Sequence, residues 1–260
     1  MKSLILRSFS LLLPALLFAE PGSPPPFEWR RVENTAFGVG ERINYQIRFG
    51  VLAGGTAWQE VEGREEEGGR PAFRIVSEAR TNKVFDVVHK VREKHESWMD
   101  AQSLCSLKFT ETVREGSYRK QSETVLNPPQ GRLVHTYNTT KHQGTATAKT
   151  PSYLQDSVSL VYFLRTLPLV VGAAYEVPFH LGGKVHPVKV IVKAIEKIRV
   201  PAGSFDCFHL IPVYPEDLPP VWHFEFWLTT DARHAPVLVK SKLAVGSFSA
   251  RLTEYTPGRR

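Results

Sequence analysis

The sequence predicts a mainly β protein: a curved antiparallel sheet or open barrel of about 11–12 strands, wrapped on one short buried helix. Three observations predict it. Apolar and polar residues alternate along most of the chain from Gly40 onward, as in strands with one buried and one solvated face. Turns rich in Gly and Pro separate these runs at regular spacing. Almost no helical segment intervenes, which excludes a parallel sheet built from strand–helix–strand units.

The alternation is clearest at residues 43–49, where Ile43, Tyr45, Ile47 and Phe49 take every second position. Side chains at every second position of a strand point to the same face of the sheet. The same pattern predicts a shared face for each of three later sets: Cys105, Leu107 and Phe109; Tyr175, Val177, Phe179 and Leu181; and Trp222, Phe224, Phe226 and Leu228.

Residues 156–165, with the sequence DSVSLVYFLR, predict a short helix. Asp156 precedes the apolar residues, and its carboxylate can accept hydrogen bonds from the free N–H groups of the first turn. A helix that is apolar on most of its circumference is expected to be buried, so we expect it to lie against the concave face of the sheet. Residues 83–88 predict a second short helical turn.

The N-terminus has the layout of a secretory signal peptide, which we assign to residues 1–19. Lys2 and Arg7 precede an apolar run that ends at Ala19. The alternative, a buried N-terminal helix, is disfavoured by the prolines that follow. Residues 20–35 are a proline-rich linker, and residues 36–256 form a single antiparallel β domain. We therefore expect an exported protein, periplasmic or envelope-associated in a Gram-negative-type bacterium.

Charge and hydropathy exclude two other classes of protein. The apolar part of the signal is too short to cross a bilayer, and Arg165 interrupts the most apolar later segment, so the mature chain is expected not to span the membrane. The formal net charge is +7, with Lys and Arg scattered along the strands and not gathered in blocks. Nucleic acid is therefore not expected as a partner, whereas a weak attraction to anionic envelope surfaces stays open.

Two features leave their interpretation open. Cys105 and Cys207 could form a disulfide in an oxidising compartment, or both could be buried free thiols. Segments that begin at Val39 and Val171 both open with Val-Gly and continue with Tyr-x-(Ile/Val)-x-Phe. Together with later Trp- and Asp-bearing segments, they predict an internal duplication of about residues 39–114 and 171–243.

The string FGVGERINYQIRFGVLAGGTAW, which begins at Phe37, resembles the opening of a bacterial envelope family, the domain of unknown function 3108. Later stretches are similar to the same family in the same order: ESWMD, QDSVSLVYFLRTLPL, VPAGSFDCFHL and FWLTTDARHAPVLV. The resemblance implies export, no established activity, and a curved antiparallel sheet on a helix, similar to lipoprotein-carrier shells of the periplasm. Where this chain has Cys105, the family more often has Pro, so no family-wide disulfide is implied.

Candidate catalytic and metal-binding residues have equally good structural interpretations. Glu93 and His95 should share one face of a strand, with Glu96 on the other, a spacing that suits acid–base chemistry but also a solvated strand. The nine histidines and two cysteines show no metal-binding spacing. We therefore assign no catalytic residue, metal or cofactor, and favour a protein that is not an enzyme.

Five residues are weak candidates for ligand binding. Asp156, Tyr162 and Arg165 could orient a ligand at the mouth of an apolar cavity, or could attach the helix to the sheet by buried hydrogen bonds. Trp98 and Trp227 offer stacking surfaces for a glycan or lipid.

We expect a non-enzymatic binding or carrier module for a hydrophobic or envelope-derived ligand, with a lipid, a glycan or an envelope protein as its partner. The alternatives are a structural partner in envelope assembly and a hydrolase of envelope polymers. The oligomeric state and the ligand stay open.

Overall fold

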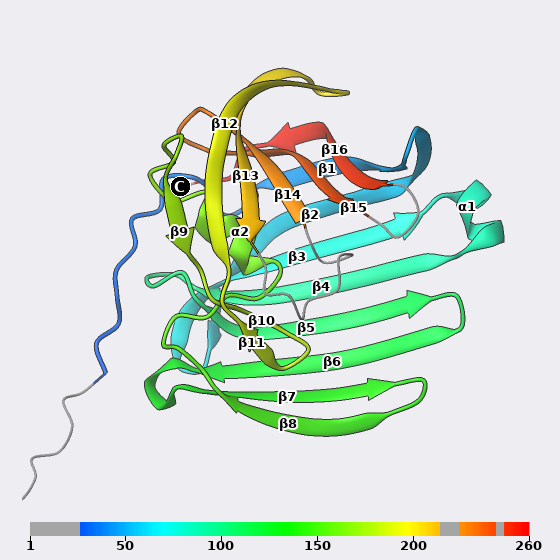
Figure 1. Ribbon diagram of the computed structural model, residues 1–260. Coiled ribbons are helices and arrows are strands. Elements are labelled where there is room, and N and C mark those ends of the chain that lie inside the picture. Colours follow the sequence, from blue (N-terminus) through cyan, green and yellow to red (C-terminus); the bar gives the residue numbers. More distant parts are fainter. Residues whose placement is uncertain (1–26, 214–223, 243–246, 260) are drawn as a thin grey trace, which may run out of the picture.

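A computed structural model of the chain describes residues 27–213, 224–242 and 247–259, and the expected signal peptide lies outside this part. The described residues contain sixteen strands, and fourteen of them form one antiparallel sheet (Figure 1). These are β1 (Arg42–Phe49), β2 (Leu52–Glu67), β3 (Arg70–Thr81), β4 (Val91–Asp100), β5 (Ser106–Glu115), β6 (Tyr118–Asn127), β7 (Arg132–Thr139), β8 (Gln143–Lys149), β9 (Ala174–Glu176), β12 (Lys189–Val200), β13 (Gly203–Val213), β14 (Phe224–Thr229), β15 (Pro236–Lys242) and β16 (Ser247–Thr256). The other two, β10 (Phe179–Leu181) and β11 (Lys184–His186), form a separate hairpin.

The sheet joins two runs of sequential antiparallel strands. Its order is β8-β7-β6-β5-β4-β3-β2-β1-β16-β15-β14-β13-β12-β9, so β1 to β8 are neighbours in chain order, as are β12 to β16. The two runs meet where β1 pairs with β16, for example with Ile47 opposite Ala250. The end strands β8 and β9 do not pair with each other, so the sheet is open. The predicted fold class, a curved antiparallel sheet around a short buried helix, is confirmed.

The number of strands exceeds the expected 11–12, and one run was assigned wrongly. Residues 175–181 were predicted to form one strand with Tyr175 and Phe179 on a shared face. Instead β9 ends at Glu176 on the edge of the sheet, and Phe179 begins the separate hairpin. Pro178 lies between them and has no N–H to offer a sheet, which explains the interruption. The four apolar side chains of this run nevertheless all lie in or against the main core, as their shared face predicts.

A β-bulge overturns a second expectation, that Cys105, Leu107 and Phe109 share a face. Trp98 of β4 pairs with Lys108 of β5, but the next residue of β4 pairs with Ser106, so Leu107 is an extra residue. An extra residue reverses the side to which the following side chains point. Cys105 and Leu107 therefore lie in a small cluster with Trp98, whereas Phe109 lies in the main core.

Both predicted helical segments are present. The first, α1 (Lys83–Val88), matches the expected turn, and its N-cap Asn82 accepts hydrogen bonds from Val84 N and Phe85 N. The second, α2 (Ser159–Leu164), is shorter than the expected 156–165, but all six of its residues are buried as predicted. A short 3₁₀ helix, η1 (Pro128–Gln130), connects β6 and β7.

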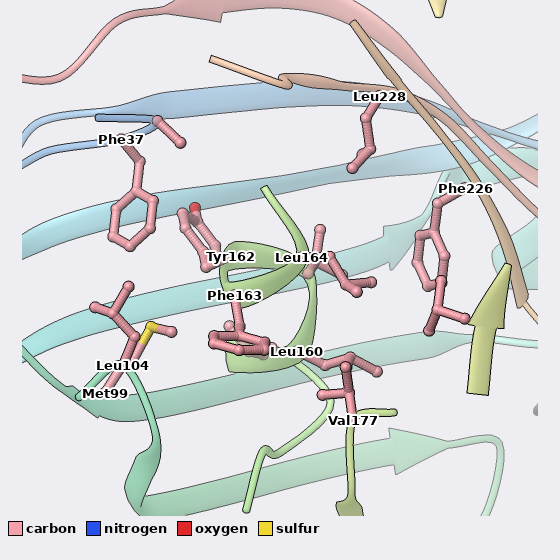
Figure 2. Packing of buried hydrophobic residues seen from close by; sticks show 14 of the residues in the cluster. Phe37, Met99, Leu104, Leu160, Tyr162, Phe163, Leu164, Val177, Phe226 and Leu228 are labelled. Carbon is pink, nitrogen blue, oxygen red and sulfur yellow. The ribbon is translucent and has the colours of Figure 1, made fainter. Parts of the chain in front are cut away.

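The main core lies between α2 and the concave face of the sheet, which we call the inner face. Figure 2 shows the α2 side chains of Leu160, Tyr162 and Phe163 surrounded by side chains that come from distant parts of the chain. These neighbours include Phe37, Met99, Leu104, Val177, Phe226 and Leu228. The helix thus fills the part of the concave face where the side chains are most apolar.

The two cysteines are free and buried in different clusters. The two segments of the proposed duplication also have different structures: the segment at Val39 leads into the central strand β1, whereas the segment at Val171 divides into β9 and the β10–β11 hairpin.

Candidate functional site on the inner face of the sheet

Asp156 attaches the start of α2 to two strands of the inner face. Its Oδ2 accepts hydrogen bonds of 2.6 Å from the hydroxyls of Ser97 on β4 and Ser106 on β5. Its Oδ1 accepts from the backbone N–H groups of Val158 and Ser159 at 2.8 and 2.7 Å. Asp156 thus makes the predicted hydrogen bonds to free N–H groups, but from the turn before the helix, because the N-cap of α2 is Val158, which makes no side-chain cap. The bulge in β5 turns Ser106 inward to reach this carboxylate.

Arg165 attaches the end of α2 to the beginning of β1. Its guanidinium forms a bidentate, fully buried ion pair with Glu41, at 2.6 and 2.7 Å. The same guanidinium donates to the backbone oxygens of Ala36 and Arg233, each at 3.1 Å. The hydroxyl of Tyr255 donates to Glu41 at 2.7 Å. Both ends of α2 are therefore held by buried charged groups whose hydrogen-bonding capacity is used within the protein.

The other three residues that the sequence suggested for ligand binding lie in different parts of the structure. Tyr162 lies beside Glu41 and Arg165; its buried hydroxyl has no hydrogen-bond partner among the described residues, and burial raises its pKa well above the ordinary value. Trp98 donates to Glu65 on the surface, and Trp227 stacks on His209 at 4.2 Å while donating to Glu196. The structure therefore brings Asp156, Tyr162 and Arg165 together along α2 and places the two tryptophans elsewhere.

A second group of polar residues lies on the inner face of β4, β5 and β6, beyond α2. His95 of β4 is directly opposite Glu111 of β5, which is opposite Ser122 of β6. Directly paired residues point to the same face of a sheet, and so do residues two positions apart on one strand. Glu93 and Lys120 therefore also point to this face, and Glu93 shares it with His95 as predicted. We call these five residues the inner-face band.

The band contains one ion pair and several groups without a partner. Glu111 accepts hydrogen bonds from Lys120 Nζ at 2.5 Å and from Ser122 Oγ at 2.7 Å. Within the described residues, the Glu93 carboxyl makes no hydrogen bond or ion pair. His95 contacts the ring of Phe109 at 5.8 Å. Along β4 the inner-face side chains change from fully buried at Ser97 to half-buried at His95 and Glu93. The band is therefore open to solvent toward the α1 end of the sheet.

The β10–β11 hairpin lies at the inner end of the band and contributes a buried histidine. His180 is 2% exposed, and neither ring nitrogen has a hydrogen-bond partner among the described residues. Its ring is 5.7 Å from that of Phe109, and its backbone N–H donates to Gln155 O at 2.9 Å. The turn of the hairpin packs on His135 of β7. The side chain of His135 would clash with a Cβ atom at Gly183.

Burial and neighbouring charges shift the pKa values of two carboxyls of the band, and of the adjacent His180, in different directions. Burial raises the pKa of Glu93. Burial acts in the same sense on Glu111, but Lys120, His95 and the Ser122 hydroxyl together hold the pKa of that carboxyl below its ordinary value. Burial lowers the pKa of His180 to about 4, so its imidazole is neutral at pH 7. The site therefore combines a carboxyl that protonates easily, a persistent carboxylate and a neutral imidazole.

The spacing of Glu93 and His95 makes them candidates from the sequence, whereas no sequence motif indicates Glu111, Lys120 or His180 as site residues. Glu111 could have been found from its parity with Phe109 along β5. His180 could not, because it reaches the band through a hairpin that starts about forty residues beyond β7. No group of three or more His, Cys, Asp or Glu side chains suited to a metal ion occurs among the described residues. A search of these residues also finds no helix long and apolar enough to cross a membrane.

Comparisons with known proteins give a family and a fold. The family described as "Protein of unknown function (DUF3108)" matches residues 44–253, and no curated protein matches the chain. A solved β-barrel-like protein of the domain of unknown function DUF1849 from Brucella abortus aligns with a TM-score of 0.58 at 12% identity, covering 86% of this chain and 100% of that one. A putative lipoprotein from Parabacteroides distasonis aligns with a TM-score of 0.31 at 8% identity, covering 88% and 100%.

Proposed function

Because the chain belongs to the DUF3108 family, which brings no known activity with it, we propose its function from its own geometry: an exported, envelope-associated binding module that holds a polar, envelope-derived ligand on the inner-face band. The observation that carries this proposal is the buried imidazole of His180, whose two ring nitrogens have no hydrogen-bond partner among the described residues. The half-buried Glu93 and His95 of the band also make no hydrogen bond or ion pair with the described residues. A buried polar group without a partner is costly and indicates a place where something else supplies the partner.

The chemistry of the band indicates the class of ligand. Glu111 is a carboxylate, Lys120 has further ammonium N–H groups beside the one that it donates to Glu111, the Ser122 oxygen can accept, and the neutral His180 can both donate and accept. Groups of this kind match the hydroxyl and amide groups of a glycan or peptide fragment better than an acyl chain. A purely hydrophobic ligand fits less well, because α2 already fills the apolar part of the inner face.

Native mass spectrometry of the protein purified from its own cell envelope tests this proposal. The wild-type protein is expected to carry an additional mass, and the inner-face variant Glu93→Ala/His95→Ala is expected to lose it. The matched control Lys94→Ala/Glu96→Ala changes neighbouring residues of the same strand on the opposite face and should keep the ligand. A wild-type protein without ligand, or retention of the ligand by the inner-face variant, would contradict the proposal.

A hydrolase of envelope polymers is the second candidate, because the pKa values of Glu93 and Glu111 are shifted in opposite directions on neighbouring strands. A carboxyl that protonates easily near a persistent carboxylate is the arrangement that glycosidases use as acid and nucleophile or base. This function predicts release of soluble fragments from isolated envelope polymer, with loss of release in Glu93→Gln and in Glu111→Gln. Binding without release favours the first function.

A further inference from the structure

One end of the molecule exposes several large apolar side chains. Val84, Val87 and Val88 of α1 are 74%, 87% and 86% exposed, and no residue of this helix is buried. Val51, in the turn between β1 and β2, and Leu52, the first residue of β2, are 80% and 60% exposed. We call these five residues the α1 tip. Single exposed apolar residues are common on protein surfaces, but a contiguous group marks an interaction site.

The two segments of the α1 tip are fastened to each other. Asn82, the N-cap of α1, donates from its side chain to Ala53 O at 2.7 Å and from its backbone to Gly54 O at 2.8 Å. The rings of Phe49 and Phe85 stack beneath them at 5.4 Å. Figure 1 shows α1 and the β1–β2 turn projecting from the same end of the sheet. The five apolar side chains therefore belong to one surface.

A row of arginines crosses the outer face of the sheet immediately behind the tip. Arg80 of β3 is opposite Arg92 of β4, which is opposite Arg114 of β5, which is opposite Arg119 of β6. Strands lie about 4.8 Å apart, so the row is about 14 Å long. Like charges directly opposite each other destabilise a sheet. Four in succession indicate that the row serves a purpose other than stability.

Most of this positive charge is not neutralised within the protein. Arg92 pairs with Asp86 of α1 at 2.6 Å, and Arg119 donates to backbone oxygens. Arg80 and Arg114 have no acidic partner among the described residues. With Arg92 they line a pocket of about 270 Å³, whose lining also includes Trp58 and two carboxyl residues, Glu78 and Glu93.

We propose that this end of the protein docks on the surface of an anionic lipid bilayer. The valines of the α1 tip enter the boundary between headgroups and acyl chains, and the arginine row binds lipid phosphates beside them. Apolar side chains next to basic ones are the combination by which peripheral proteins hold such surfaces. A nucleic acid would match the arginines but leave the valines in water.

The docking surface and the inner-face band lie at the same end of the sheet but on different faces of β4. Arg92 points outward and Glu93 inward, at adjacent positions. Docking through the tip therefore places the open end of the band close to the bilayer. The docking proposal does not depend on ligand binding at the band: Glu93 also lines the pocket beside the arginine row, but none of the valines and arginines of the docking surface belongs to the band.

Co-sedimentation with lipid vesicles tests the proposal, using the full chain expressed with its own N-terminus and recovered without detergent. Phosphatidylcholine vesicles are compared with vesicles that also contain phosphatidylglycerol. The wild-type protein should bind the anionic vesicles, and binding should weaken as salt is raised. Val87→Asp/Val88→Asp should reduce binding at least about tenfold, because two apolar contacts are replaced by repelled charges. Arg80→Glu/Arg114→Glu should reduce it about fivefold for each basic residue removed.

The matched control variants carry the same types of substitution at other positions on the surface of the protein. Val170→Asp/Val171→Asp alters exposed valines elsewhere, and Arg132→Glu/Lys149→Glu alters an opposed basic pair on β7 and β8. Both controls should bind like the wild type, and since every variant has the same N-terminus, differences report the substituted surface. Failure of the wild type to bind anionic vesicles, equal loss in the controls, or binding of a DNA duplex in preference to vesicles would overturn the proposal.

Discussion

The two helices α1 and α2 have the same length and a similar apolar composition, yet opposite positions in the fold. Each has six residues; all six are buried in α2 and none in α1. Charged groups at both ends fasten α2 inside the sheet, through Asp156 and Arg165. Polar groups hold α1 at the rim, through the side-chain amide of Asn82 and the Asp86–Arg92 ion pair. The two helices therefore differ in where their polar anchors bind: to inner strands and the start of β1 for α2, and to the rim of the sheet for α1.

Removal of the buried acidic anchor is the strongest test of this comparison. Glu41→Ala leaves Arg165 buried without its counter-ion, and we expect the free energy of unfolding to fall by about 3–5 kcal/mol in urea titrations. The double variant Glu41→Leu/Arg165→Met replaces both charges by apolar groups and should recover much of this loss. If the double variant is no more stable than the single one, the pair does more than hold the helix.

The second test truncates one apolar residue on each helix. The two truncations should differ in their effect on the free energy of unfolding. Leu164 is 1% exposed, and Leu164→Ala should lower the free energy of unfolding by about 2–5 kcal/mol. Val88 is 86% exposed, and Val88→Ala should change it by less than about 0.5 kcal/mol. Equal effects would mean that α1 is also part of the core.

The pH dependence of stability distinguishes the unsatisfied band from the paired groups around α2. The pKa of His180 is about 4 in the folded protein against an ordinary value of 6.5, so the unfolded chain binds more protons between these values. Stability should fall as the pH is lowered through this window, by about 2 kcal/mol between pH 7 and pH 5 from this residue. Urea midpoints of wild-type protein and His180→Leu at the two pH values measure it. A wild-type decrease that persists unchanged in His180→Leu would place its origin elsewhere.

The smallest expected effect is a gain. Burial raises the pKa of Glu93, so its charged form is disfavoured in the fold. Glu93→Gln removes that charge and should increase stability at pH 7 by about 0.5 kcal/mol while reducing ligand binding. Thermal unfolding with and without bound ligand gives both quantities. A loss of stability would indicate that Glu93 has a structural partner.

The sequence was most informative where a pattern depends only on neighbours along the chain. Alternation placed Glu93 and His95 on one face, and the capping position of Asp156 was visible from the residues that follow it. The bulge at Leu107 could not be predicted, because it depends on how β5 pairs with β4. It places the Ser106 hydroxyl at Asp156, which is a contact between residues far apart in the chain. His180 reaches the band because the β10–β11 hairpin folds back over the inner face of the sheet. No pattern of neighbouring residues in the sequence predicts that contact.

The pairing of β1 with β16 has a consequence for the order in which the molecule folds. The strands from β1 to β8 pair with their chain neighbours and can form as they are synthesised, and so can those from β12 to β16. The contact between Arg42 and Thr256 instead waits for nearly the whole chain. Until then β1 and β16 are unpaired edges in addition to β8 and β9, so their pairing is expected to be the slow step of folding and to remove two of the four edges open to aggregation.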